Sequence, residues 1–125
     1  MYSVTRERFG ELIEEVLAEL PEQFAKFVEE IPIEVADRPS PKQLRDAHVP
    51  RGHTLLGLYH GRNRLSRSVA DTGALPDVIY LFQQPIQSMC DNDEDLRRQV
   101  RITLLHEIGH HFGMDEDDLE KLGYR

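Results

Sequence analysis

Near its end the chain reads Leu104-Leu105-His106-Glu107-Ile108-Gly109-His110-His111-Phe112-Gly113, and this stretch decides the fold. It contains the pattern His-Glu-x-x-His. On a helix, residues four apart differ by about 40° in direction and about 6 Å in height, so His106 and His110 aim their imidazoles at the same point. Glu107 lies about 100° further around the helix, where its carboxylate reaches a metal-bound water without binding the metal. The spacing therefore predicts a zinc site of the hydrolase type.

Apolar residues surround the motif and predict a helix that is buried on much of its circumference. They are Ile102, Leu104, Leu105, Ile108 and Phe112. A helix that only completes a core would not carry His-Glu-x-x-His there, so we favour a metal site over histidines with a purely structural role. His111 points about 100° away from His110, and we interpret it as a surface histidine or one that supports a ligand.

Composition limits the class of protein. The 125 residues, 39% of them apolar, suffice for a single domain over residues 1–125. Neither a membrane-spanning run nor a signal peptide is recognisable, so we expect a cytoplasmic protein without a membrane partner. The single cysteine, Cys90, agrees with a reducing compartment, and we interpret it as a partly buried thiol. The net charge of −8 disfavours nucleic acid as a partner.

Helices are predicted at both ends of the chain. Apolar residues at i, i+3 and i+4 predict a first helix from Ser3 or Thr5 to Leu20. Pro21 then starts a second helix, from Glu22 to Glu29. The motif lies on a long helix from about Asp93 to Phe112, whose N-cap and negative first turn come from Asp91-Asn92-Asp93.

Strands are predicted between these helices. The first runs from Ile31 to Ala36, and Pro32 indicates that it lies at a sheet edge. The second runs from Thr54 to Gly61, and Gly57 within it predicts a bulge or a close backbone approach. The run Val78 to Phe82 is the clearest strand of the chain. Strands and helices together predict an α+β domain.

The connecting segments are predicted to be mostly irregular. Asp37 to Arg51 is interpreted as a loop with one helical turn at Lys42 to Asp46, and His48 and His53 as solvated loop residues. Pro85 is taken as the end of the last strand. A short helix is then expected from Ile86 to Cys90.

Several patterns together resemble a known family, the minimal zincin-like metallopeptidases of bacteria. They are the motif itself, Gly113 three residues after His110, Leu-Pro-Asp-x-Ile at Leu75 to Ile79, and Leu-Leu-Gly-Leu-Tyr at Leu55 to Tyr59. The resemblance runs over about residues 5 to 124. It implies a minimal zincin-like fold, in which a small mixed sheet packs against helices and a long C-terminal helix carries the active site.

The family pattern extends the motif to His-Glu-x-x-His-x-x-Gly-x-x-Asp, whose histidines and aspartate bind zinc. This chain has Glu116 at the last position, so the resemblance implies His106, His110 and Glu116 as zinc ligands. Glutamate reaches further than aspartate by a methylene group, and Asp115 and Asp117 therefore stay open as alternatives to Glu116.

An aromatic residue near the C-terminus is thought to support the metal site in this family, and Tyr124 occupies that place. The resemblance therefore adds Tyr124 to Glu107 as a candidate catalytic residue, through support of the site or a hydrogen bond to an oxyanion. A packing role for Tyr124 alone stays equally open.

The predicted function is hydrolysis of peptide bonds in a peptide or protein substrate, by a zinc-activated water with Glu107 as general base. An extended substrate is expected to pair with a strand edge near Arg62 to Ser66. Arg62 and Arg64 are themselves more simply explained as a solvated charged strand than as a substrate clamp.

Three alternatives stay open. A non-catalytic metal-binding or protein-interaction module is favoured by the departure at Glu116. A zinc-dependent endoribonuclease is disfavoured by Glu116 in place of a third histidine and by the net charge of −8. A structural zinc site usually has four protein ligands rich in cysteine. The sequence also leaves the oligomeric state, monomer or homodimer, undecided.

Overall fold

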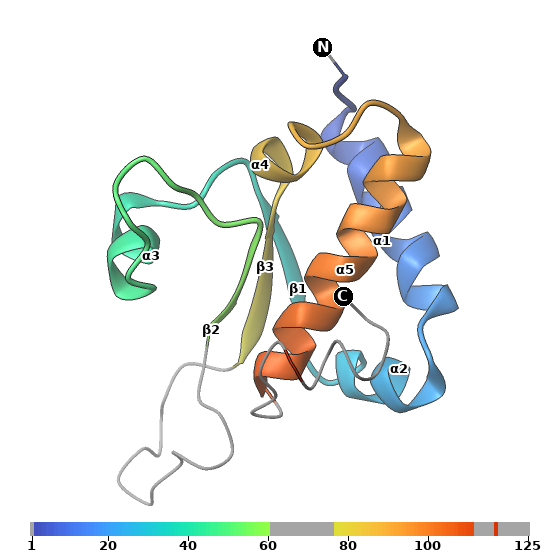
Figure 1. The fold of residues 1–125 in the computed structure, drawn as a ribbon. Helices are drawn as coiled ribbons and strands as arrows, with labels where there is room; N and C mark the ends of the chain where they lie inside the picture. Colours follow the sequence, from blue (N-terminus) through green and yellow to red (C-terminus); the bar gives the residue numbers. More distant parts are fainter. Residues whose placement is uncertain (1, 61–76, 112–116, 118–125) are drawn as a thin grey trace, which may run out of the picture.

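The computed structural model describes residues 2–60, 77–111 and 117, and for Gln23, Phe27 and His111 it describes the backbone only. These residues form an α+β fold, as the sequence predicts (Figure 1). The elements are α1 (Arg6–Glu19), α2 (Glu22–Val28), β1 (Ile33–Ala36), α3 (Pro41–Asp46), β2 (Gly57–His60), β3 (Val78–Phe82), α4 (Gln83–Gln87) and α5 (Asp93–His111).

The sheet is mixed and has the strand order β1-β3-β2. Its central strand, β3, runs parallel to β1 and antiparallel to β2. Four of the five residues of β3 are buried, which explains why this strand reads as an uninterrupted apolar run. The predicted edge position of β1 is confirmed, because β1 pairs only with β3 among the described strands.

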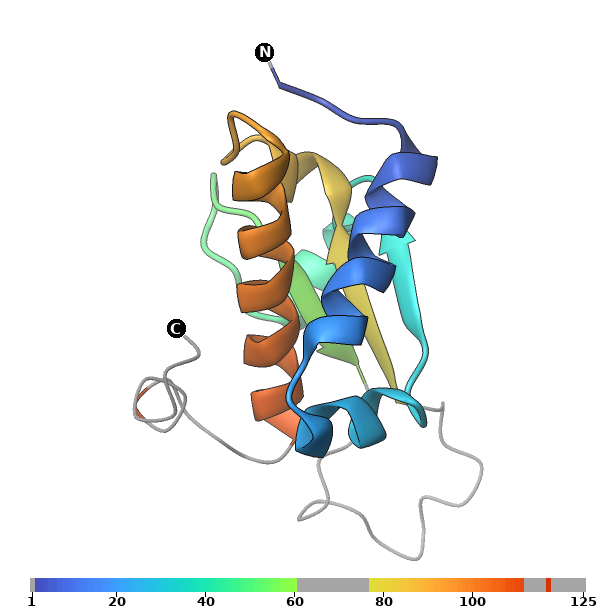
Figure 2. The ribbon, with the colours of Figure 1, turned by 90° about the vertical axis from the view of Figure 1, so that its right-hand side faces the viewer.

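Helices α1 and α5 lie side by side across the same face of the sheet (Figure 2), whereas α3 lies on the other side (Figure 1). The apolar stripe predicted for the first helix is buried in the core that these layers enclose. The core includes Phe9, Leu12 and Val16 of α1, Ile79 and Leu81 of β3, and Leu96, Val100, Leu104 and Ile108 of α5. The motif helix is therefore anchored in the core along its length.

The helix starts follow the capping rules. Thr5 caps α1 by accepting a hydrogen bond from the Arg8 backbone N–H at 3.0 Å. Asn92 accepts one from the Asp95 backbone N–H at 2.8 Å, which confirms the predicted cap of the long helix. The turn predicted at Lys42 to Asp46 is the helix α3, which starts one residue earlier at Pro41.

Several predicted boundaries are wrong. The short helix expected at Ile86 to Cys90 is instead α4, at Gln83–Gln87. Pro85 lies in the first turn of α4, where a missing backbone N–H costs nothing, so it belongs to the helix start and does not end the strand. The strand expected from Thr54 begins only at Gly57, and the one expected from Ile31 begins at Ile33.

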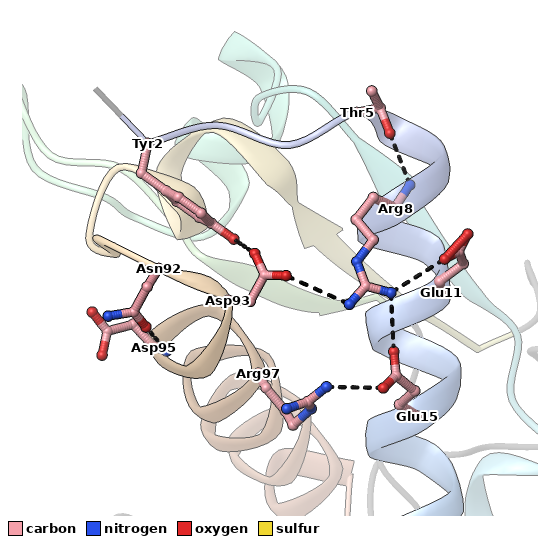
Figure 3. Close-up of polar contacts among 9 residues, drawn as sticks. All are labelled: Tyr2, Thr5, Arg8, Glu11, Glu15, Asn92, Asp93, Asp95 and Arg97. Atoms are coloured by element: carbon pink, nitrogen blue, oxygen red, sulfur yellow. Dashed lines mark hydrogen bonds and ion pairs between the residues drawn. The ribbon is translucent and has the colours of Figure 1, made fainter.

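A polar cluster joins α1 to the start of α5 (Figure 3). The Arg8 guanidinium lies 3.5 Å from an Asp93 carboxylate oxygen and 3.3 Å from one of Glu15, and Arg97 pairs with Glu15 at 2.8 Å. The Tyr2 hydroxyl donates to Asp93. This hydrogen bond and the charge of Arg8 hold the pKa of Asp93 below its ordinary value. The cluster ties down the end of α5 opposite to the motif.

Candidate metal centre

The imidazoles of His106 and His110 lie on one side of the last turns of α5. Their ring centroids are 4.4 Å apart, and the ring planes are inclined by 66°. His106 is half-buried and His110 is exposed. The four-residue spacing thus brings both rings to one end of the helix, at the surface of the core.

Glu107 differs from both histidines because it is buried, with only 6% of its surface exposed. Its carboxylate oxygen Oε1 accepts a hydrogen bond from the backbone N–H of Tyr59, in β2, at 2.9 Å. The same oxygen lies 3.3 Å from Nδ1 of His110. A buried carboxylate needs such partners, since burial of an unpaired one is costly.

The donor set of these residues fits a metal ion. His106, Glu107 and His110 each offer one ligand atom, and these atoms all lie within 4.8 Å of one another. Imidazole nitrogens with a carboxylate oxygen are ligands that zinc accepts, and neutral imidazole is its commonest nitrogen ligand in proteins. The two imidazoles therefore have the chemistry to hold a divalent metal, with the Glu107 carboxylate close beside them.

Strand β2 approaches α5 unusually closely beside this group. A Cβ atom placed on Gly57 would lie 2.7 Å from Cγ2 of Thr103 and 3.1 Å from the Tyr80 carbonyl oxygen. It would also lie 3.3 Å from Cγ of Glu107. Of the two explanations offered for this glycine, the close approach is confirmed. The bulge is not formed, since the pairing with β3 runs without interruption from Gly57 to His60.

A sequence profile of the zincin-like metallopeptidase family matches residues 28–124, which include all of α5. This chain belongs to the zincin-like metallopeptidase family. Membership agrees with the resemblance found in the motif, and it implies a metal, typically zinc. No curated protein matches this zincin-like chain.

A solved structure is similar to this zincin-like protein over nearly its whole length. It is a conserved hypothetical protein from Thermus thermophilus, with 26% sequence identity and a TM-score of 0.55. The match covers 95% of this chain and 97% of the other. The likeness supports the fold, and the other protein's description assigns it no activity.

The remaining candidates for the zincin site lie outside the group or outside the described residues. Glu116, Asp115 and Tyr124 are among the residues that the structure does not describe, and so are Arg62 and Arg64. Asp117 is exposed and does not join the three-residue group. The third ligand and the role of Tyr124 thus stay predictions.

Histidines elsewhere in the zincin-like domain agree with the sequence interpretation. His48 and His53 are exposed on the connection between α3 and β2.

Cys90 is more deeply buried than expected, at 6% exposure, and its thiol donates to the Ile86 carbonyl oxygen at 3.3 Å. Burial raises the pKa of this thiol, which makes it a poor nucleophile.

Sequence reasoning missed one partner of Glu107 and one neighbour of Gly57 within the zincin-like site. The Tyr59 donor is a backbone N–H, which leaves no mark in the residue type. Thr103 packs against Gly57 from one turn earlier on α5, and its buried Oγ1 has no hydrogen-bond partner in the part of the chain that the structure describes. Gly57 in an apolar strand was the available signal that another group lies close to β2, whereas the Tyr59 donor had no such signal.

Proposed function

We propose that this protein is a zinc-dependent metallopeptidase that hydrolyses peptide bonds in a peptide or protein substrate. The observation that carries the proposal is the meeting of His106, Glu107 and His110, with Glu107 buried and hydrogen-bonded to the sheet. A buried, oriented carboxylate beside two imidazoles is what a metal hydrolase requires of a general base.

His106 and His110 would hold the zinc ion, with Glu116 as the third ligand by its position in the family pattern. Bound zinc supplies a Lewis acid and lowers the pKa of a water molecule toward about 7. His110 turns Nδ1 toward Glu107, at 3.3 Å from Oε1, which leaves Nε2 as its nitrogen for the metal. The carboxylate would thereby orient the ring of this ligand.

Glu107 is the proposed general base and, later in the reaction, the general acid. Its Oε1 is held by the Tyr59 N–H, so Oε2 is the oxygen that takes a proton from the attacking water. Glu107 then returns the proton to the departing amine. Since Glu107 is 6% exposed, the position of its side chain is set by the protein and not by bulk water.

The edge of β2 is the proposed support for an extended substrate. The Phe82 N–H donates to the Leu56 carbonyl at 2.9 Å, so Leu56, Leu58 and His60 direct their peptide groups toward β3. Gly57 and Tyr59 direct theirs away from β3, and the Tyr59 N–H accordingly meets Glu107. A peptide that pairs with this edge at Gly57, and leaves the Tyr59 N–H to Glu107, would pass beside the base.

A non-catalytic metal-binding or protein-interaction module is the second candidate. The observation that favours it is Glu116 at a position where the family pattern has aspartate. A longer ligand that displaces the metal from Glu107 would keep binding and lose hydrolysis.

Hydrolysis of unfolded casein by the zinc-loaded protein separates the two candidates. Glu107→Gln should keep zinc and lose at least about 100-fold in rate, since it keeps the shape but removes the base. His106→Ala should lose both. Glu94→Gln, the same change at an exposed glutamate in the first turn of α5, should change neither. Zinc binding without hydrolysis by the native protein would support the module instead.

A further inference from the structure

We propose that Gly57 and Thr103 are positioning residues, which set the distance at which the Tyr59 N–H holds Glu107. We call the four residues Gly57, Tyr59, Thr103 and Glu107 the β2–α5 contact. The inference rests on the proposed function, because it gives these residues a task in orienting the general base. It is carried by the packing of the strand edge against the helix.

The Tyr59 N–H is available to Glu107 because of the register of β2. Tyr59 stands opposite Ile79 at a position where the strand's peptide groups point away from β3. The donor is therefore not used within the sheet, and it lies 2.9 Å from Oε1 of Glu107. A hydrogen bond to a carboxylate is stronger than one between neutral groups, so it restrains a side chain that has three rotatable bonds.

Gly57 is needed for space and not for its backbone conformation. Gly52 alone has a positive φ among the described glycines, so Gly57 occupies a region open to any residue. A Cβ there would lie 2.7 Å from Thr103 Cγ2, which is closer than real Cβ atoms approach other atoms. A side chain at this position forces a shift, and because Thr103 is β-branched and buried on α5, we infer that β2 moves away from α5.

Thr103 fills the space that the missing side chain leaves. It lies on α5 one turn before Glu107 and is 4% exposed, and its methyl group faces Gly57. Its Oγ1 has no hydrogen-bond partner among the described residues, so the methyl group is the part of the side chain with an evident packing role. The packing of Gly57 against the methyl group of Thr103 thus determines the separation of β2 and α5.

The consequence is a Glu107 whose Oε1 is held in a defined position. Oε1 is fixed between the Tyr59 N–H and Nδ1 of His110, at 2.9 and 3.3 Å. A displacement of β2 by a fraction of an ångström would lengthen the first of these bonds and free the carboxylate to turn. Gly57 and Thr103 touch neither substrate nor metal, so they act only through Tyr59 and Glu107.

The first arm of the test measures hydrogen exchange of the Tyr59 amide by NMR, which needs no activity. Leu58 is the internal reference, because its amide faces β3. Gly57→Ala should speed exchange at Tyr59 relative to Leu58 by at least about tenfold. Glu107→Ala, which removes the acceptor without touching the strand, should do the same. Glu107→Gln keeps an acceptor oxygen and should retain the protection.

Double variants distinguish a specific clash with the Thr103 methyl group from a nonspecific loss of stability. Gly57→Ala with Thr103→Ser, which removes the methyl group, should regain most of the protection at Tyr59. Gly57→Ala with Thr103→Val keeps the methyl group and should not. Gly10→Ala is the matched control, since a Cβ at Gly10 meets nothing within 4 Å. Unchanged exchange at Tyr59 in Gly57→Ala, or equal rescue by serine and valine, overturns the inference.

The second arm measures casein hydrolysis by the same zinc-loaded variants. Gly57→Ala should lower kcat by about tenfold with KM within about twofold and zinc content unchanged, and Thr103→Ser should restore kcat. If Gly57→Ala frees Tyr59 and keeps its kcat, the positioning role is overturned although the contact exists. If the native protein cleaves no casein, the proposed function is wrong, and so is the catalytic role of these residues. The hydrogen-exchange measurement still decides whether Gly57 determines the geometry of the β2–α5 contact.

Discussion

The backbone N–H of Tyr59 lies 2.9 Å from Oε1 of Glu107, so a strand edge and the motif helix meet in one hydrogen bond. The two residues are 48 positions apart in the chain. The bond gives Glu107 a fixed orientation beside the imidazoles of His106 and His110. In this zincin-like protein the sheet therefore does more than cover the helix, because it also restrains the proposed base.

Substitution of alanine for glycine should have opposite effects on stability at two positions. Gly10→Ala should raise the free energy of unfolding by about 0.5–1 kcal/mol, because Gly10 lies within α1 and its Cβ would have open space. Gly57→Ala should lower it by about 1–3 kcal/mol through overpacking against Thr103. Urea denaturation of both variants checks the pair. Equal effects at the two sites would contradict the close packing of β2 against α5.

Removal of the Thr103 hydroxyl should not destabilise the protein. Thr103→Val keeps the shape and deletes a buried Oγ1 that lacks a hydrogen-bond partner among the described residues. We expect a gain of up to about 1 kcal/mol in the free energy of unfolding. The same change at Thr5 should cost about 1 kcal/mol, because Thr5 Oγ1 caps α1. A loss at both sites in chemical denaturation would mean that Thr103 has a partner.

Acid should weaken the contact between α1 and α5. The Tyr2 hydroxyl and Arg8 lower the pKa of Asp93 in the folded protein (Figure 3). A lowered folded pKa contributes stability that is present above about pH 4, the ordinary value, and is lost as pH falls through the folded value. Asp93→Asn should flatten this acid dependence of the urea midpoint, and Tyr2→Phe should flatten it in part. An unchanged slope in Asp93→Asn would contradict the assignment.

Zinc should stabilise the folded protein if the histidines hold it. At a free concentration about 100 times the dissociation constant, a ligand adds roughly 2.7 kcal/mol to the free energy of unfolding. Thermal unfolding with and without zinc should show this rise for the native chain and lose it in His106→Ala. His53→Ala, at an exposed loop histidine, is the matched control and should keep the rise. A similar rise in all three proteins would indicate binding elsewhere.

Local patterns made much of the fold predictable. The periodicity of α1, the cap at Asn92 and the four-residue spacing of His106 and His110 each depend on neighbours within a turn or two of helix. Pro85 was ambiguous, because a proline suits both the end of a strand and the first turn of a helix. The sequence alone did not decide between them.

Contacts between distant segments were not predictable in the same way. The Tyr59 N–H reaches Glu107 only because of the register between β2 and β3, and a backbone donor has no residue type to signal it. Gly57 indicated that something lies close to β2. It did not indicate that the neighbour is Thr103 on the motif helix.

The most direct test of the account is zinc stoichiometry by elemental analysis of the native protein and of single variants. We predict about one zinc per chain, lost in His106→Ala and in Glu116→Ala and kept in Glu107→Gln. That result would assign the ligands and leave Glu107 as the base. No zinc uptake by the native protein from excess zinc, or loss of zinc in Glu107→Gln, would contradict the account.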